Sequence, residues 1–312
     1  MKYLVFILFL LALVPLGFSA ETILATSSYA FAERWSNGCL YGIKFPRAMF
    51  VFCLDESGKY YVHAECHIIP GEMPTQAIIG HGSFGWFRLP AGCQAIIYEP
   101  KEVVDGGCGV SSFVCSLEIK DEEGNPVIEM ETENLISVGG YFLPDVIQVG
   151  KAPTIEGYVR TRKGYVTELF EYCFAKGSFR SIMQRSLNLL AGLLSGSVPY
   201  CEVKGNPNIL VATGGKSISF TTEPLSDTGV WTLILGIREI SGEIITGEWR
   251  LPVAEFYVVD EPVHKKKLKR DLYLVYWGER QVDWFGEYSK LLYVGMFCLL
   301  IVGIARVIRW GS

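Results

Sequence analysis

Eight cysteines lie in the middle of this 312-residue chain, between two hydrophobic end segments. An even number of cysteines in a chain that enters an oxidising compartment is typical of a disulfide framework. The ninth cysteine, Cys298, lies inside the C-terminal apolar segment and is separate from that set. We expect four disulfides, formed by Cys39, Cys53, Cys66, Cys93, Cys108, Cys115, Cys173 and Cys201.

The N-terminal segment, residues 1–19, has the parts of a signal peptide. Lys2 precedes an apolar run over 4–14, and the small residues Gly17 and Ser19 occupy the two restricted positions before a cleavage site after Ser19. We expect cleavage after Ser19, so that the mature chain begins at Ala20. An uncleaved signal anchor stays open as an alternative, although the run is short for a span of about 20 residues.

The C-terminal segment, residues 291–308, predicts one transmembrane helix. Its length matches a hydrocarbon core of about 30 Å at a rise of about 1.5 Å per residue. Arg306 and Arg309 lie at its end, where basic residues mark the cytoplasmic side. We therefore expect a single-pass protein of a cell surface or virion envelope, with its N-terminus outside, a cytoplasmic tail at 309–312 and the lipid bilayer as a partner.

The composition of the middle segment indicates strands. Aromatic residues make up 13% of the chain, and short runs of Val, Ile, Tyr and Phe alternate with Gly, Pro and Asp clusters. We predict a mainly β fold, with two disulfide-stapled β-sandwich-like ectodomain units plus the C-terminal transmembrane helix. A Cys-rich β domain would span 20–143, and a second sandwich would span 144–262.

Strand spacing removes one disulfide pairing. Residues 48–66 read as two strands around a turn that begins at Asp55. Cys53 and Cys66 would then be offset by about six residues along the ladder, which is too far for a disulfide at about 3.3 Å per residue. The sequence therefore predicts other partners for both.

Two local pairings are expected instead. Cys108 and Cys115 flank a short glycine-containing loop, and Cys173 and Cys201 bracket one apolar segment. If both bridges form, the remaining cysteines pair within the N-terminal half. Those are Cys39, Cys53, Cys66 and Cys93.

The segment 144–260 resembles immunoglobulin-like β-sandwich modules of surface proteins. The resemblance rests on a Val-Gly turn at 149–150, on a corner formed by Asp227, Gly229 and Trp231, and on a final Phe-x-Val-Val strand at 256–259. It implies a fold and no activity, because such sandwiches carry many unrelated functions. The Cys…Trp…Cys spacing of antibody domains is absent.

An apolar segment at 177–200 interrupts the second unit, and it contains no Lys, Asp or Glu. Its apolar residues fall at helical spacing until Gly196 and Pro199. One interpretation is an exposed element that contacts a membrane or partner, and the other is a short helix packed on the sandwich. The expected contact residues are Ile182, Leu189, Leu190, Leu193 and Leu194, together with Trp277 and Trp284 further along.

The segment 263–290 is predicted to be a basic and aromatic membrane-proximal stem. Its basic cluster contrasts with residues 20–264, which carry 29 acidic and 18 basic side chains. The cluster could contact anionic headgroups or envelope polymers, be a dibasic processing site, or form a solvated linker. It consists of Lys265, Lys266, Lys267, Lys269 and Arg270. A helix through the aromatic part would place its rings on one face, suited to the membrane interface.

Catalytic and metal motifs are weak. His63 and His67 would lie about 13 Å apart on a strand, which is too far for one metal ion. His81 lies in a glycine-rich turn that is not a nucleophile elbow. The acidic turn at 121–125 has oxygen ligands for Ca²⁺ but reads better as a hairpin tip. We expect no catalytic residue, metal or cofactor, and no nucleic-acid partner, because the middle segment is acidic.

Three hypotheses follow for the function. The first is a non-enzymatic membrane-anchored surface protein that acts in adhesion, attachment or envelope structure, with an unidentified protein or envelope partner; self-association stays open. The second is a membrane-fusion or membrane-remodelling protein that uses the apolar residues at 182–194. The third is an ectoenzyme with a site near the histidines.

Overall fold

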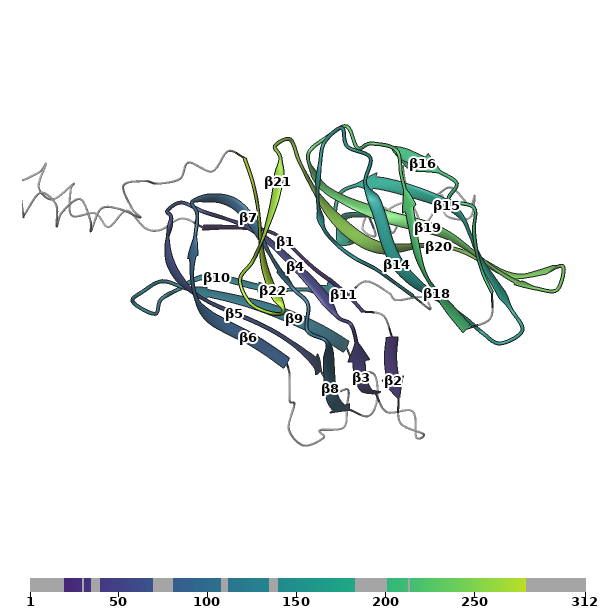
Figure 1. Cartoon of the computed structure of the whole chain (residues 1–312), viewed down its shortest axis with the longest axis horizontal. Helices are drawn as coiled ribbons and strands as arrows, with labels where there is room; N and C mark the ends of the chain where they lie inside the picture. Colours follow the sequence, from purple (N-terminus) through teal and green to yellow (C-terminus); the bar gives the residue numbers. More distant parts are fainter. Residues whose placement is uncertain are drawn as a thin grey trace, which may run out of the picture. The chain divides into compact units, whose positions relative to one another are not determined.

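The computed structural model describes residues 20–29, 31–34, 40–69, 81–107, 112–134, 140–182, 201–212 and 214–278. The chain divides into two units, Met1–Trp277 and Gly278–Ser312, and the first holds every described strand. The described strands of this first unit form two β-sandwiches (Figure 1).

The first sandwich packs sheet A against sheet C. Sheet A has the order β11 (Glu133–Asn134), β1 (Ala20–Ser28), β4 (Arg47–Leu54), β7 (Gly92–Tyr98), β22 (Leu272–Trp277), β21 (Val263–Lys267). Sheet C has the order β10 (Pro126–Glu131), β9 (Ser112–Lys120), β5 (Gly58–Ile69), β6 (His81–Leu89). A small sheet B extends this sandwich with β2 (Phe31–Arg34), β3 (Leu40–Lys44) and β8 (Glu102–Gly107).

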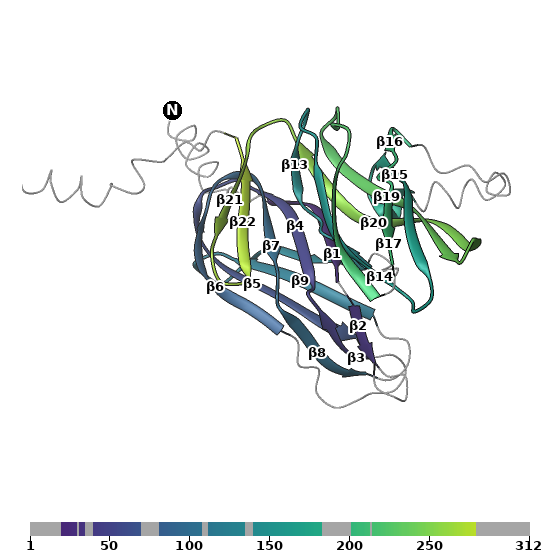
Figure 2. The same cartoon turned by 45° about the vertical axis from the view of Figure 1, so that its right-hand side comes forward.

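The second sandwich lies, in sequence, between β11 and β21. Sheet D has the order β12 (Gly140–Phe142), β14 (Thr154–Thr161), β18 (Gly214–Thr221). Sheet E has the order β13 (Val146–Gln148), β20 (Ile244–Val259), β19 (Gly229–Ser241), β15 (Val166–Lys176), β16 (Val203–Gly205), and β17 (Ile209–Val211) also pairs with β15. The chain thus leaves the first sandwich, builds the second and then returns to sheet A (Figure 2).

Strand β4 shows why sheet A is central. A strand buried on one face alternates apolar and polar residues, whereas residues 48–52 of β4 are all apolar and fully buried. Phe50 and Phe52 point into the core between sheets A and C. Met49 and Val51 point the other way, into a second cluster that includes Val146 and Val259 of the second sandwich. Sheet A is therefore covered on both faces.

The corner predicted in the second sandwich is present. Trp231 is fully buried, and its indole Nε1 donates a hydrogen bond to the carbonyl of Asp227 at 3.0 Å. Gly229 between them has a φ of 110°, a conformation that side chains with a Cβ rarely adopt. The β-sandwich-like fold of this segment is thus what its sequence indicates.

The predicted fold class needs a correction. The described chain is mainly β structure with three disulfides. Within the described ranges, no helix combines the length and the apolar character needed to cross a membrane. The segments expected as signal peptide (1–19), transmembrane helix (291–308) and tail (309–312) all lie outside those ranges.

The expected stem also differs from the structure over 263–277. These residues form the hairpin β21–β22, and β22 pairs with β7, with Leu274 opposite Ile96. Leu272 and Leu274 are buried in the core between sheets A and C. Leu272 and Leu274 are buried while Tyr273 between them is only partly buried, a period of two that fits a strand and not the helix that we expected from the aromatic spacing. The rest of the stem lies outside the described residues.

Candidate functional site

The outer face of sheet C carries two large exposed aromatic side chains on its edge strand, β6. Side chains alternate along a strand, so Ser83 and Leu89 point into the core while Phe84 and Trp86 point outward. Phe84 is 55% exposed and Trp86 is 47% exposed. Large exposed rings placed side by side mark a contact surface more often than single exposed apolar residues do.

Cationic side chains surround these rings, and we call the whole surface the aromatic–cationic face. Its members come from β5, β6, β9 and the turn between β21 and β22. They are Lys59, Tyr61, His63, Phe84, Trp86, Arg88, Lys120 and Lys269.

The strand register sets the order of this face. Tyr61 lies opposite Trp86, and their rings meet edge to face with centroids 5.6 Å apart. His63 lies opposite Phe84, with ring centroids 6.1 Å apart. The ammonium of Lys59 lies 5.2 Å from the centre of the Trp86 ring. These contacts hold the indole in place while leaving much of its surface exposed.

The turn between β21 and β22 reaches this face from a distant part of the sequence. Lys269 Nζ donates a hydrogen bond to the carbonyl of Phe84 and lies 5.3 Å from the centre of its ring. Ser83 Oγ donates a hydrogen bond to Asp271 Oδ1 at 2.9 Å. The turn that carries Lys269 therefore contacts the edge strand of sheet C. No local pattern in the sequence indicates this contact.

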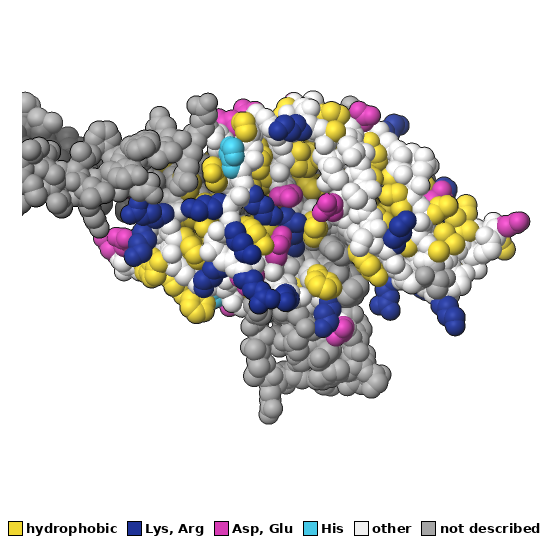
Figure 3. Space-filling model, in the orientation of Figure 1, with side chains coloured by type: hydrophobic (Ala, Val, Ile, Leu, Met, Phe, Trp, Pro, Cys, Tyr) yellow, Lys and Arg dark blue, Asp and Glu magenta, His cyan; other side chains and the backbone are white. Residues whose placement is uncertain are grey.

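The rest of the basic cluster lies along the same hairpin. Lys265 and Lys267 lie on one face of β21, with their ammonium groups 4.7 and 5.9 Å from the centre of the Tyr273 ring. Lys265 Nζ also lies 3.9 Å from a carboxylate oxygen of Glu99. Lys and Arg side chains gather over the region of β21 and β22 in Figure 3. Lys265 and Lys267 lie on the same face of the hairpin as Tyr273 and Val275, which is the face of sheet A turned away from sheet C, so these two lysines are not part of the aromatic–cationic face.

Two disulfides staple the first sandwich, and one sequence expectation about them is wrong. Cys53 pairs with Cys93 across β4 and β7, and Cys66 pairs with Cys115 across β5 and β9. Cys115 is therefore not joined to Cys108. The local loop suggested that pair, whereas the register of β5 against β9 places Cys115 directly opposite Cys66. Cys39 and Cys108 lie outside the described side chains.

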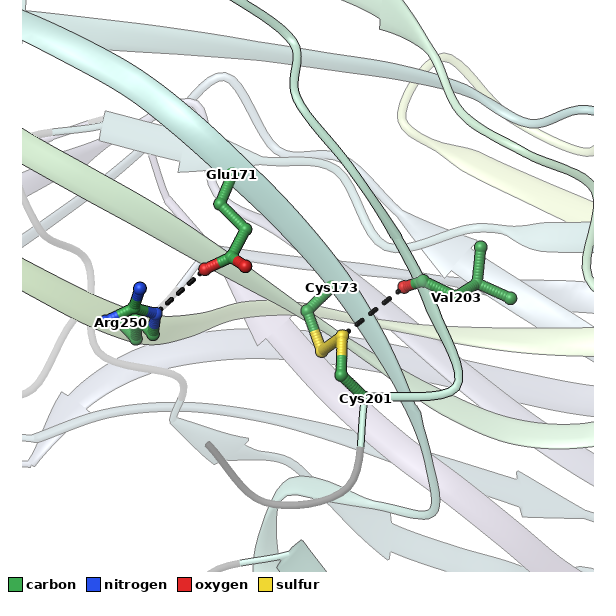
Figure 4. Close-up of a disulfide and its surroundings, with 5 residues drawn as sticks. All are labelled: Glu171, Cys173, Cys201, Val203 and Arg250. Carbon is green, nitrogen blue, oxygen red and sulfur yellow. Dashed lines mark hydrogen bonds and ion pairs between the residues drawn. A yellow bond between two sulfur atoms is a disulfide. The ribbon is translucent and has the colours of Figure 1, made fainter. Parts of the chain in front are cut away.

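The expected Cys173–Cys201 bridge is present in the second sandwich (Figure 4). A hollow of about 150 Å³ lies beside it, lined in part by Glu171, Lys204 and Arg250. Arg250 Nε donates a hydrogen bond to Glu171 Oε2 at 2.8 Å, so these two polar groups satisfy each other. The hollow is small and internally paired, which makes it a weaker candidate than the aromatic–cationic face.

Of the residues expected to contact a membrane or partner, the structure describes Ile182 and Trp277, and these two lie in different apolar clusters. Ile182 is only 5% exposed and packs against Ala175 and Ile234, so the apolar stripe begins inside the protein and not on its surface. Trp277 packs against Tyr257, with ring centroids 5.6 Å apart, at the cluster that joins the two sandwiches. The other expected contact residues lie outside the described chain: Leu189, Leu190, Leu193, Leu194 and Trp284.

The histidines and the acidic turn offer no assembled metal site in the described part of the chain. His63 Nε2 lies 3.6 Å from Glu65 on the same strand. In the turn, Asp121 Oδ1 accepts hydrogen bonds from the backbone N–H groups of Glu123 and Asn125, at 2.9 and 2.8 Å. The oxygens that could have bound a cation instead order the hairpin tip.

The comparisons with known proteins find little. No protein-family model matches the chain, and no curated protein matches it. Among solved structures, the chain is similar to the transglutaminase of red sea bream, with 11% sequence identity and a TM-score of 0.20. The match covers 80% of this chain but only 31% of that one, so this chain spans less than a third of that protein's length. A likeness this weak carries no argument about activity.

The expectation that the protein is not an enzyme is nevertheless withdrawn. The solved protein named above is a transglutaminase, which is an enzyme. The likeness is too weak to transfer a reaction to this chain, and it identifies no catalytic residue here.

Proposed function

We propose that this protein is an extracellular attachment or adhesion protein that binds a surface component through the aromatic–cationic face. The observation that carries the proposal is the pair of exposed rings, Phe84 and Trp86, between cationic side chains on an open edge strand. Trp, Tyr, Phe and Arg are enriched where proteins bind partners. Three disulfides support an oxidising, extracellular location.

We further propose that the second sandwich is an immunoglobulin-like module. The buried Trp231, with its hydrogen bond to the carbonyl of Asp227, supports this assignment. The fusion hypothesis receives less support, because the apolar stripe on which it rests begins with the buried Ile182.

The proposal is tested by surface retention of the full-length protein. We expect that replacing both rings, Phe84→Ser and Trp86→Ser, lowers the fraction retained on cells or particles of the source by about tenfold, since hot-spot aromatics carry much of the binding energy. The matched control is Trp249→Ser, a 42% exposed tryptophan of the second sandwich. Equal retention of the double variant and the control, with unchanged circular dichroism, would contradict the proposal.

A further inference from the structure

The aromatic–cationic face presents its groups in a row. Along β6, Phe84, Trp86 and Arg88 all point outward, and successive outward side chains on a strand lie about 7 Å apart. Lys59 lies opposite Arg88 on β5. Lys269 lies over Phe84 at the other end. The row is thus two rings flanked by cations on each side, about 13 Å long from residue 84 to residue 88 at about 3.3 Å per residue, and no described strand pairs with the outer edge of β6.

The cations at the ends of the row have no carboxylate partner among the described residues. Lys59 and Arg88 form no ion pair with any carboxylate in the described part of the chain, and neither does Lys269. The acids on this sheet face lie off the row: Glu118 pairs with Lys120 at 2.8 Å, Glu65 lies 3.6 Å from His63 Nε2, and Glu129 and Glu131 lie on β10 at the opposite edge of the sheet. The row itself is therefore positive and complements a ligand that repeats negative charge along an extended chain.

The surroundings of the row favour a polymer over a bilayer. Burying the rings in a membrane would also desolvate the ion pair of Lys120 with Glu118 and the neighbouring His63 and Glu65, which share this flat face. An extended polymer can cover the edge strand alone and leave those groups hydrated. Bases of single-stranded nucleic acid stack on such rings too, but the disulfides place the chain in an oxidising compartment, away from the cytosol.

We infer that the aromatic–cationic face binds an acidic polysaccharide. Trp86 and Phe84 stack against sugar rings, while Lys59, Arg88 and Lys269 contact carboxylate or sulfate groups. The inference rests on the proposed attachment function and names the ligand class for that same surface.

The test measures binding of the full-length protein to defined probes. The probes are polygalacturonate, dextran sulfate, neutral dextran, a poly(dT) oligonucleotide and vesicles containing phosphatidylserine. We expect binding to both acidic polysaccharides at physiological salt and its loss at 1 M salt, where the Debye length falls to about 3 Å. Neutral dextran, poly(dT) and the vesicles should bind at least tenfold more weakly.

Variants separate stacking from general charge attraction. Trp86→Ser and Lys59→Glu should each weaken binding to both acidic polysaccharides by about tenfold. Trp249→Ser and Lys216→Glu change an exposed tryptophan and an exposed lysine of the second sandwich and should leave binding unchanged. Equal binding by Trp86→Ser and Trp249→Ser would overturn the inference, and so would preferential binding to poly(dT) or to the vesicles.

The ligand class and the attachment function can fail separately. If surface retention requires Phe84 and Trp86 but neither acidic polysaccharide binds, the ligand class is wrong and the attachment function stands. If the polysaccharides bind through Trp86 but retention is independent of it, the attachment function is wrong and the binding specificity stands.

Discussion

Asp121 shows how single residues order this fold. It begins the turn between β9 and β10, where its carboxylate accepts a hydrogen bond from the side chain of Asn125 at 2.9 Å. Backbone N–H groups of Glu123 and Asn125 donate to the same carboxylate. The hydrogen bond from the Asn125 side chain is the largest cause that holds the pKa of Asp121 below its ordinary value. The backbone hydrogen bonds lower this pKa further.

This shift predicts a pH dependence. A carboxyl whose pKa is lower in the folded than in the unfolded state stabilises the fold above the unfolded pKa, near pH 4, and that stabilisation is lost as pH falls through the folded pKa. We expect carboxyl titration by NMR to show a lowered pKa for Asp121, and Asn125→Ala to move it upward. An unchanged titration in Asn125→Ala would show that the hydrogen bond has no part in the shift.

At the scale of elements, strand register decides what sequence proximity cannot. The bridge from Cys66 to Cys115 joins β5 and β9, although Cys108 is much closer to Cys115 in sequence. The Cys53–Cys93 bridge likewise joins two cysteines that face each other across a ladder. Both described bridges of the first sandwich therefore join cysteines at directly opposed positions on neighbouring strands.

The same rule predicts a fourth bridge. Leu40 of β3 lies opposite Gly107 of β8, and the residues that adjoin these two in sequence are Cys39 and Cys108. We expect a non-reducing peptide map to show these two joined, and their double replacement by serine to lower the free energy of unfolding by about 2–4 kcal/mol. A free thiol at either position in the native protein would contradict the prediction.

At the scale of the molecule, an apolar cluster joins the two sandwiches. Met49 of β4 and Val275 of β22 pack there with Val146 and Val259 of the second sandwich. Nearby, Arg47 Nη2 lies 3.2 Å from Asp145 Oδ2 at the junction, and Arg47 Nε lies 3.1 Å from Glu99 Oε1. Because the chain also returns to sheet A after the second sandwich, we expect the two sandwiches to stabilise each other.

Replacement of Met49 tests this coupling. Met49→Ala should cost about 2–5 kcal/mol, as for other fully buried large-to-small changes, and should lower hydrogen-exchange protection at 257–259 of β20. The matched control is Met130→Ala, which empties space only in the core of the first sandwich. Equal loss of protection at 257–259 in both variants would argue against a specific role for the joining cluster.

The sequence by itself determined the local features of this protein. Runs of β-branched and aromatic residues set the strands, the Asp-x-Gly-x-Trp pattern set the corner at Trp231, and the two cysteines that bracket 174–200 set their own bridge. The strands and the corner depend on residues close in sequence. The bridge depends on the tendency of cysteines to pair in an oxidising compartment.

Only the tertiary structure decided the pairings over long distances. The return of β22 to β7, the partner of Cys115 and the placement of Lys269 over Phe84 all depend on strand register. Every residue except proline offers the same backbone hydrogen-bonding groups, so the sequence alone does not state which strands pair. The aromatic–cationic face exists because that pairing brings a late basic hairpin to an early edge strand.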